Sequence, residues 1–516
     1  MRKYYILLAL LFTTLLGSCS KNIEIIELNI VPEPVYVNMK DGSFTVSGKT
    51  KLFFENLGQN SETSKYVSKT LRKNHLHLSP SGKDTDNDIV FKLNDTTNIE
   101  IGDEGYILEV KPEGIYISAN TEAGLFYGFQ TLMQMLPENI ATTRYNRITL
   151  PCCTILDFPA FSWRGSHRDV SRHFFSVKDI KKQLDLMAAY KMNKFHWHLT
   201  DDHGWRIEIE KYPELNEMAS WRVDRDTIPW GEAEPAQEGE ERTYGGFYTK
   251  EEIKEGVEYA AERHIDVIPE IEFPGHCACI LEAYPQYGCE NDDTTYQIQI
   301  GPYWPPRAIL CGGNDSVMQF LKDIMDEVVP LFPYEYIHVG GDEAYKDNWK
   351  RCPRCQKRIK ELGLHDENQL QSWMVQEIEK YLALKGKKVI GWDEMLDGGI
   401  SDQATIMSWQ GFDGAIKAAS HGNLSIMSPT EFCYFDYYQA NPDYQPTAMN
   451  HLITLYKVYQ FNPIPDSYLA KFVLGGQCNL WTEFINDENY AEYMQLPRLL
   501  AISECLWSPS DVKNWP

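Results

Sequence analysis

Tyr336-Ile337-His338-Val339-Gly340-Gly341-Asp342-Glu343 joins a short apolar strand to two glycines and a pair of carboxylates. A run of four such residues bounded by glycine is typical of a buried strand. The glycines let the backbone bend where other residues resist it, so we expect the strand to end there. Two acidic side chains therefore follow the carboxyl end of a predicted strand.

Seven other segments show a comparable short apolar strand, with amphipathic helical stretches between them. They lie around Trp163 and at residues 194–199, 265–270, 388–392, 405–409, 424–427 and 472–481. Eight βα units in roughly 350 residues is the number found in a TIM (β/α)8 barrel with insertions. An open, doubly wound α/β sheet is the alternative.

Polar residues at the strand ends favour the barrel. Most predicted strands run into carboxylates, histidines or indoles, as in Thr200-Asp201-Asp202-His203, Glu272-Phe273-Pro274-Gly275-His276, Trp392-Asp393-Glu394, Ser408-Trp409 and Trp481-Thr482-Glu483. The carboxyl ends of barrel strands converge on one pocket, so these clusters form a single predicted site. Helix capping explains only one or two of them.

The first part of the chain has a different pattern. Strand-like runs at residues 88–93, 106–110 and 115–118 are followed by helical spacing over residues 121–136. This mixture predicts a small α+β domain. We place it at residues 20–155, before a catalytic barrel at residues 156–516.

Residues 1–19 have the features of an export signal. Met1-Arg2-Lys3 precedes an apolar run from Tyr4 to Leu16, and Leu16-Gly17-Ser18-Cys19 resembles a bacterial lipobox. We expect lipidation of Cys19, with cleavage as an ordinary soluble signal as the alternative. Export to the periplasm or the outer-membrane surface follows, and contact with a membrane is expected only through the lipid anchor.

Charge and aromatic content restrict the partners. A formal net charge of -25 argues against nucleic acid, because every phosphate contact would oppose the protein's own field. The chain also carries 13 Trp and 30 Tyr, whose faces stack well on sugar rings when they are exposed. A neutral oligosaccharide or glycoconjugate fits these properties better.

Two groups of residues suggest a metal. Cys352 and Cys355 form a C-x-x-C pair, but no second pair follows at a usable spacing, so we expect a local disulfide or two buried thiols. His196-x-His198 with Asp201 resembles the metal cluster of a barrel amidohydrolase, and a metal-dependent hydrolase is therefore a rival function. Our main hypothesis needs neither metal nor cofactor.

Asp342 and Glu343 are the candidate catalytic pair. Glycosidic cleavage needs an acid for the leaving oxygen and a group that stabilises positive charge at the anomeric carbon. Neighbouring residues on a continuing strand point to opposite sides, and the preceding glycines allow both to turn toward a ligand. This arrangement does not suit an opposed acid and nucleophile. It raises the possibility that the nucleophile belongs to the substrate.

The motif His338-x-Gly340-Gly341-Asp342-Glu343 resembles the signature of family 20 β-N-acetylhexosaminidases. Three further stretches match the pattern of that family in order: Glu104-Gly105-Tyr106, the stretch from Gly128 to Leu132, and Trp507-Ser508-Pro509. The resemblance covers nearly the whole chain after the signal. It implies hydrolysis of terminal β-linked N-acetylglucosamine or N-acetylgalactosamine, with retention, through an oxazolinium ion formed by the substrate's own acetamido group.

The resemblance also implies roles for single residues. Glu343 is the acid and then the base, Asp342 orients the acetamido group, and Tyr434 bonds its carbonyl. Trp392, Trp409 and Trp481 enclose its methyl group. Ring hydroxyls are assigned to Arg164, Asp201, Asp436 and Glu483. His276, beside the substrate, and His338 are expected to support the acid through hydrogen bonds.

One stretch departs from the family. Ser166-His167-Arg168-Asp169 follows Arg164-Gly165, where the family usually has apolar residues before the Asp. Two extra basic groups near the pocket would favour an anionic substituent on the sugar, and packing alone is the other interpretation. A second rival function is a surface lipoprotein that binds glycans without cleaving them. The presence of Asp342, Glu343 and Tyr434 argues against that rival.

Overall fold

The computed structural model describes residues 21–515, except residues 26, 59, 84, 229, 291–294 and 302–306. The chain divides into two compact units, one ending at Phe158 and the other beginning at Pro159, with Val31–Glu33 grouped with the second. Cys19, the predicted lipidation residue, lies outside the described residues. None of the described helices is long and apolar enough to cross a membrane.

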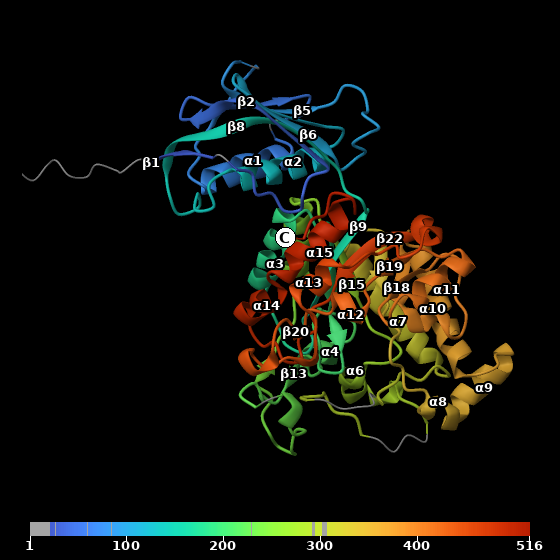
Figure 1. Ribbon diagram of the computed structural model, residues 1–516. Coiled ribbons are helices and arrows are strands. Elements are labelled where there is room, and N and C mark those ends of the chain that lie inside the picture. The colour runs from blue at the N-terminus through green and yellow to red at the C-terminus, as the bar shows by residue number, and fades with distance from the viewer. Residues whose placement is uncertain are drawn as a thin grey trace, which may run out of the picture. The chain divides into compact units, whose positions relative to one another are not determined.

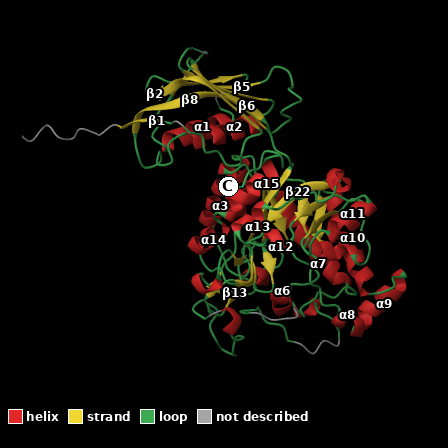
Figure 2. Cartoon of the chain, in the orientation of Figure 1, coloured by secondary structure: helices red, strands yellow, loops and turns green. Residues whose placement is uncertain are grey.

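The first unit is a mixed sheet covered by helices. Its described strands follow the order β1-β8-β6-β7-β5-β3-β4, and β2 also pairs with β8. Helices α1 and α2 lie along one face of the sheet (Figures 1 and 2). The bounds are β1 (Lys21–Glu24), β2 (Tyr36–Ser47), β3 (Lys51–Glu55), α1 (Glu62–Lys73), β4 (Ser79–Pro80), β5 (Asp88–Leu93), β6 (Tyr106–Lys111), β7 (Gly114–Ala119), α2 (Glu122–Met135) and β8 (Tyr145–Asp157).

Close packing of α2 on this sheet explains one of the sequence motifs. A Cβ added at Gly128 would lie 2.6 Å from Cγ2 of Ile117, so only glycine lets the helix approach β7 this closely. Tyr106 is fully buried, and its hydroxyl donates a hydrogen bond to Oδ2 of Asp157 at 2.6 Å. A buried phenol needs such a partner.

The second unit contains a closed barrel of parallel strands. Within the described residues the order is β10-β15-β16-β17-β18-β19-β22-β9. The strands are β9 (Trp163–Asp169), β10 (Lys194–His198), β15 (Asp266–Glu270), β16 (Tyr336–His338), β17 (Lys388–Trp392), β18 (Thr405–Ser408), β19 (Ser425–Met427) and β22 (Val473–Cys478). Each lies within a predicted segment or starts at the predicted residue. Pairing of β22 with β9 closes the barrel, so the doubly wound alternative is wrong.

Helices follow most barrel strands and surround them (Figure 1). The principal ones are α3 (Val177–Ala189), α5 (Lys250–Ala261), α7 (Asp315–Val328), α10 (Glu367–Ala383), α11 (Asp413–His421) and α15 (Arg498–Trp507). Residues 393–404, between β17 and β18, form only the short 3-10 helix η4 (Asp393–Leu396). The fifth βα unit therefore lacks a full α-helix.

Shorter elements lie mainly in the loops that join the barrel strands. They are β11 (Thr200–Asp201), β12 (Gly204–Trp205), α4 (Glu214–Glu217), β13 (Trp221–Arg222), η1 (Trp230–Glu232), β14 (Tyr244–Gly245), α6 (Ala278–Ala283), η2 (Pro285–Tyr287), η3 (Val329–Leu331), α8 (Asp347–Arg351), α9 (Pro353–Leu362), α12 (Thr430–Cys433), β20 (Tyr437–Tyr438), η5 (Pro442–Tyr444), β21 (Met449–Leu452), α13 (Leu455–Tyr459), η6 (Ser467–Lys471) and α14 (Glu488–Gln495).

Candidate active site

The carboxyl ends of the barrel strands surround a cavity of about 310 Å³. Nine residues predicted from the sequence line it: His276, Asp342, Glu343, Trp392, Trp409, Tyr434, Asp436, Trp481 and Glu483. Asp202 and His203, from one of the strand-end clusters that the sequence assigned to the site, also line it. Six further lining residues were not predicted: Arg172, Trp230, Gln299, Tyr437, Met449 and His451. The size and the mixture of indoles with carboxylates are typical of a pocket for a small polar ligand.

A tight turn presents the acid pair to this cavity. Gly340, Gly341 and Glu343 all have positive φ, at 64°, 95° and 44°. The backbone N–H of Gly341 donates to Oε1 of Glu272 at 2.9 Å, and a Cβ on Gly340 would lie 1.6 Å from Oε2 of the same carboxyl. Glycine at 340 is therefore required by both conformation and space, and the turn brings Asp342 and Glu343 to one pocket.

His276 lies between two pairs of carboxylates. Its Nδ1 is 3.3 Å from Oδ1 of Asp201 and 3.3 Å from Oδ2 of Asp202, and its Nε2 is 3.6 Å from Oδ2 of Asp342 and 3.5 Å from Oε2 of Glu343. Burial by itself would lower the pKa of His276, but the carboxylates around it raise this pKa well above its ordinary value. The charged imidazolium thus lies beside both members of the acid pair, and its support of the acid stays a prediction.

Asp342 is the more enclosed member of the pair. Its side chain is 14% exposed, against 28% for Glu343. Burial raises the pKa of Asp342, His276 opposes this shift, and the nearby carboxylates Glu270 and Glu343 add to it. Oδ1 of Asp342 is buried and has no hydrogen-bond partner within the described protein. Buried acceptors are rarely left unpaired, so this atom is suited to a ligand N–H or O–H.

Aromatic rings form the apolar side of the cavity. The ring centroids of Trp392 and Trp481 are 6.0 Å apart, and Trp409 stacks on Tyr434 at 6.2 Å. Trp392 donates its indole N–H to Oε1 of Glu270 at 2.9 Å, which fixes the ring. Burial, reinforced by Asp436, raises the pKa of Tyr434 well above its ordinary value. The phenol therefore stays protonated and can donate a hydrogen bond.

The cavity also carries an arginine among acids, with the Arg172 guanidinium 5.0 Å from the centre of the Trp481 ring. Nη2 of Arg172 is 3.0 Å from Oδ2 of Asp201 and 4.0 Å from Oε1 of Glu483, and Nη1 is 3.4 Å from Oδ2 of Asp169. Asp436 has a pKa well above its ordinary value because of burial and of the neighbouring Glu483. Oδ1 of Asp436 and Oε2 of Glu483 have no partner in the described protein. Both oxygens are available to sugar hydroxyls.

The assignment of Arg164 to the substrate is wrong. Arg164 is the second residue of β9, fully buried, and it donates from Nε to the Lys191 carbonyl at 2.8 Å and from Nη1 to the Phe161 carbonyl at 2.7 Å. Its guanidinium lies 4.9 Å from the centre of the Trp507 ring. It belongs to the amino end of the barrel, away from the pocket. Arg172, three residues beyond the end of β9, lines the cavity instead.

Asp201 and His338 also lie one layer away from the cavity. Both oxygens of Asp201 face protein groups, because Arg172 and His198 approach Oδ2 and His276 approaches Oδ1. Asp201 therefore positions Arg172 and His276, and its neighbour Asp202 lines the cavity. His338 is fully buried, with Nδ1 2.9 Å from Oε1 of Glu270 and its ring 4.9 Å from that of Trp392. His338 therefore contacts Trp392, which lines the pocket, and does not support Glu343 directly.

The unusual stretch after Arg164 does not reach the pocket. His167 is buried against His196 and Trp481, with ring centroids 4.9 and 4.5 Å away, and burial lowers its pKa well below the ordinary value. Arg168 is buried outside the barrel, where it donates to Glu488 and Gln183 at 2.9 Å each. The packing interpretation is therefore correct, and no support remains for an anionic-substituent site built from these residues.

In the suggested metal cluster, His198 and Asp201 belong to a hydrogen-bonded chain, and Nε2 of His196 lies 3.1 Å from Oε2 of Glu270 in that chain. His198 lies between Glu270 and Asp201, with Nε2 2.9 Å from Oδ2 of Asp201. Burial opposes a charge on His198, but the two carboxylates raise its pKa to about 10. A doubly protonated imidazole donates from both nitrogens and presents no lone pair to a metal. The chain links the pocket residues to the barrel interior.

The residues that were missed lie mostly on loops. Arg172 was recognisable, because it follows the carboxyl end of β9 as the acids follow other strands. Trp230 and Gln299 belong to long insertions after β10 and β15, and His451 lies in β21 between β19 and β22. No local spacing in the sequence shows that these segments fold back over the barrel.

Known proteins show the same organisation. The model of the glycosyl hydrolase family 20 catalytic domain matches residues 161–510, and that of domain 2 of the same family matches residues 27–158. A beta-hexosaminidase from Porphyromonas gingivalis is 41% identical over 501 residues, which are 95% of this chain and 61% of that protein. A beta-hexosaminidase from Vibrio furnissii is 32% identical over 489 residues, which are 92% of this chain and 76% of that protein. The chain thus spans about three fifths of the first of these relatives.

Solved structures give the same result. The exo-β-N-acetylglucosaminidase of Vibrio harveyi, solved with N-acetylglucosamine, has a TM-score of 0.82 and 30% identity, covering 94% of this chain and 74% of that one. A β-N-acetylhexosaminidase from Bacteroides fragilis has a TM-score of 0.77 and 30% identity, covering 94% and 92%. With both family domains matched in order and the barrel closed around the Asp342-Glu343 turn, this chain belongs to glycosyl hydrolase family 20.

Proposed function

We propose that the protein is an exo-acting β-N-acetylhexosaminidase that removes terminal β-linked N-acetylglucosamine or N-acetylgalactosamine from glycans. The observation that carries this proposal is the Asp342-Glu343 turn in a pocket that also holds the protonated phenol of Tyr434 and four indoles. Carboxylates supply acid catalysis and charge stabilisation, and an apolar wall that contains the phenolic donor Tyr434 suits an acetamido group. The named activities of the relatives agree with this assignment.

We propose a retaining mechanism in which the substrate's acetamido oxygen attacks the anomeric carbon. Glu343, the more exposed acid, protonates the leaving oxygen and later takes a proton from the attacking water. Asp342, held beside the His276 imidazolium, accepts the acetamido N–H and stabilises the oxazolinium ion. Asp436 and Glu483 hold ring hydroxyls through the oxygens that lack a protein partner.

A comparison of two chromogenic substrates tests this proposal. The N-acetyl-β-glucosaminide should be cleaved orders of magnitude faster than the plain β-glucoside, because the glucoside lacks both the nucleophile and the partner of Asp342. Glu343→Gln should lower kcat by roughly 10²- to 10⁴-fold on substrates with poor leaving groups and much less on activated ones. Equal rates on glucoside and N-acetylglucosaminide would reject substrate assistance.

Two rival functions predict other outcomes. A glycan-binding lipoprotein without catalysis would bind N-acetylglucosamine and release no product from either substrate. A hydrolase that depends on a metal at His196, His198 and Asp201 would lose its activity on chelation and regain it on addition of zinc. Our proposal assigns His198 to orientation of Asp201, so hydrolysis should persist in chelator-treated protein for as long as the chain stays folded.

We also propose export with a lipid anchor on Cys19. The lipobox-like stretch is the support for this proposal. In a bacterial host, labelled palmitate should be incorporated into the full chain and not into Cys19→Ser. Equal labelling of the two chains, or labelling of neither, would contradict it.

A further inference from the structure

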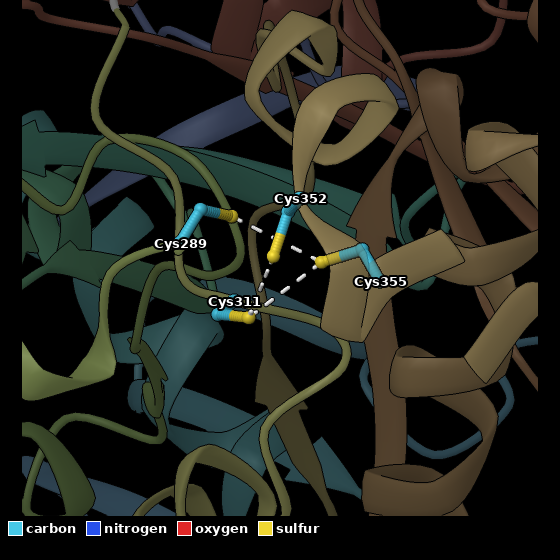
Figure 3. A group of neighbouring side chains, drawn as sticks. All are labelled: Cys289, Cys311, Cys352 and Cys355. Carbon is cyan, nitrogen blue, oxygen red and sulfur yellow. Dashed lines mark hydrogen bonds between the residues drawn. The ribbon is translucent and has the colours of Figure 1, made fainter. Parts of the chain in front are cut away.

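Four cysteines from three separate segments meet beside the barrel (Figure 3). Cys289 follows η2, Cys311 precedes α7, and Cys352 and Cys355 lie at the start of α9. Their sulfur atoms all lie within 4.8 Å of one another, and all four are free thiols. Of the two alternatives expected for Cys352 and Cys355, the local disulfide is therefore wrong and the pair of buried thiols is confirmed.

The distances between the sulfur atoms distinguish a metal site from a disulfide. Sγ of Cys311 is 3.6 Å from that of Cys355 and 3.8 Å from that of Cys352, and Sγ of Cys289 is 3.9 Å from that of Cys355. A disulfide would require about 2.05 Å. Zinc bound to four thiolates at about 2.3 Å in a tetrahedron places the sulfurs about 3.8 Å apart. Three of the six edges of the cluster are close to this length, and the other three are no longer than 4.8 Å.

The backbone around the cluster holds these positions. A Cβ on Gly313 would lie 2.2 Å from the carbonyl carbon of Arg354, so the loop after Cys311 packs directly on the first turn of α9. The N–H of Cys311 donates to the Tyr287 carbonyl at 2.9 Å, and Nη2 of Arg354 donates to the Gly288 carbonyl at 3.2 Å. The three segments are thus joined to one another around the sulfurs.

The two cysteines on α9 have the arrangement of a metal-binding pair. Cys352 is the residue before the helix, Pro353 occupies its first position, and Cys355 lies in its first turn. Three of the four cysteines are buried and Cys289 is partly exposed, so the cluster is shielded yet reachable from solvent. Four thiolates gathered in this way are a common ligand set for structural zinc.

We propose that Cys289, Cys311, Cys352 and Cys355 bind one Zn²⁺ ion as a closed structural site. All four positions are protein ligands, so no place remains for water or substrate, and the ion takes no part in hydrolysis. This departs from our expectation, on sequence alone, that no metal is present.

The site would stabilise one side of the active-site pocket. Cys289 and Cys311 bracket the loop that carries Gln299, a residue of the pocket lining. The chain from Glu343 to Cys352 is short, and Asn348 within it donates from Nδ2 to the Tyr296 hydroxyl at 2.9 Å and to the Arg307 carbonyl at 3.2 Å. The metal would therefore hold this loop and the segment after the catalytic acid to the same helix.

Metal analysis of the intact chain tests the proposal. Protein purified without chelators should contain about one zinc per chain by mass spectrometry of the elements. Cys289→Ser/Cys355→Ser should lose this zinc and melt at a lower temperature. The matched control, Cys433→Ser/Cys505→Ser, changes two cysteines that lie outside the cluster and should keep the metal. Zinc that persists in the first double variant would overturn the proposal.

Two further measurements do not depend on the fold of a variant. Wild-type chain refolded with cobalt(II) should show the visible absorption of a tetrahedral tetrathiolate complex, which zinc then abolishes. Alkylation under denaturing conditions without reductant should label all four cysteines. The proposal would be rejected if the wild-type protein contained no zinc. It would also be rejected if the measured mass of the alkylated chain showed that Cys289–Cys355 and Cys311–Cys352 are disulfides.

Discussion

Replacing Arg172 by lysine tests which arginine serves the pocket. The guanidinium reaches three acids at once, with Nη2 3.0 Å from Asp201 and 4.0 Å from Glu483, and Nη1 3.4 Å from Asp169. Lysine keeps the charge but has a single nitrogen, so it cannot maintain this geometry. The substitution removes the fork that orients Glu483 toward the ligand.

The size of the effect follows from the interaction that lysine cannot make. A hydrogen bond to a charged group contributes about 1.5–3 kcal/mol, and because Arg172 lines the cavity we expect lysine to lose one such bond from the guanidinium to the ligand. This corresponds to a decrease in kcat/KM of roughly 10- to 150-fold on a chromogenic N-acetyl-β-glucosaminide. The melting temperature should also fall, because three buried carboxylates lose part of their compensation.

Arg164→Lys is the matched control. This side chain is equally buried, but its bonds go to the carbonyls of Lys191 and Phe161, away from the cavity. The variant should melt at a lower temperature and retain kcat/KM within about threefold of wild type, measured well below its melting point. If Arg164→Lys lost as much kcat/KM as Arg172→Lys, the placement of the two arginines would be refuted.

Three other predictions follow from the pocket. Burial and the neighbouring Asp342 raise the pKa of Glu394 to about 8 in the folded protein, above the value in the unfolded chain. The protonated carboxyl therefore stabilises the fold fully at acidic pH, and this stabilisation is lost as the pH rises from about 5 through 8. The melting temperature of Glu394→Gln should consequently decrease less over this range than that of wild type, and parallel curves would contradict the assignment. Gly340→Ala should prevent folding of the acid turn and abolish activity, because its Cβ would lie 1.6 Å from Glu272. The control Gly399→Ala has φ of 95° and open space around its Cβ, so it should lower the free energy of unfolding by only about 1–2 kcal/mol in a denaturant titration. Tyr434→Phe removes the one phenolic donor to the acetamido carbonyl and should lower kcat by roughly 10²- to 10³-fold, and an unchanged kcat would remove Tyr434 from the mechanism.

The sequence alone predicted the elements whose signals are local. All eight barrel strands were located, because most of them are short runs with apolar residues limited by turn-forming or polar residues, although β9 is largely polar and was located only by its first residue, Trp163. The convergence of their carboxyl ends then brought nine predicted residues to one cavity. Asp342 and Glu343 were identifiable because the two glycines and both acids are consecutive.

The pattern of short strand segments does not show at which end of a barrel strand a side chain lies, or which groups surround it in the folded chain. Arg164 and Arg172 stand eight positions apart, but β9 places one at the amino end of the barrel and the other at the pocket. His276 has no distinctive sequence neighbour that shows its charge. Its raised pKa arises from carboxylates contributed by the loops after β10 and β16.

The sequence by itself therefore located the barrel strands and the candidate acid pair, because short strand segments and adjacent residues are encoded locally, and the pairing of β22 with β9 in the tertiary structure then excluded the doubly wound alternative. Only the tertiary structure decided which arginine meets the pocket and which cysteines meet each other. Cys311 lies 41 and 44 residues from its neighbours on α9, and Cys289 lies 66 from Cys355. Contacts across such separations come from the packing of whole segments, and no spacing within any one segment records them.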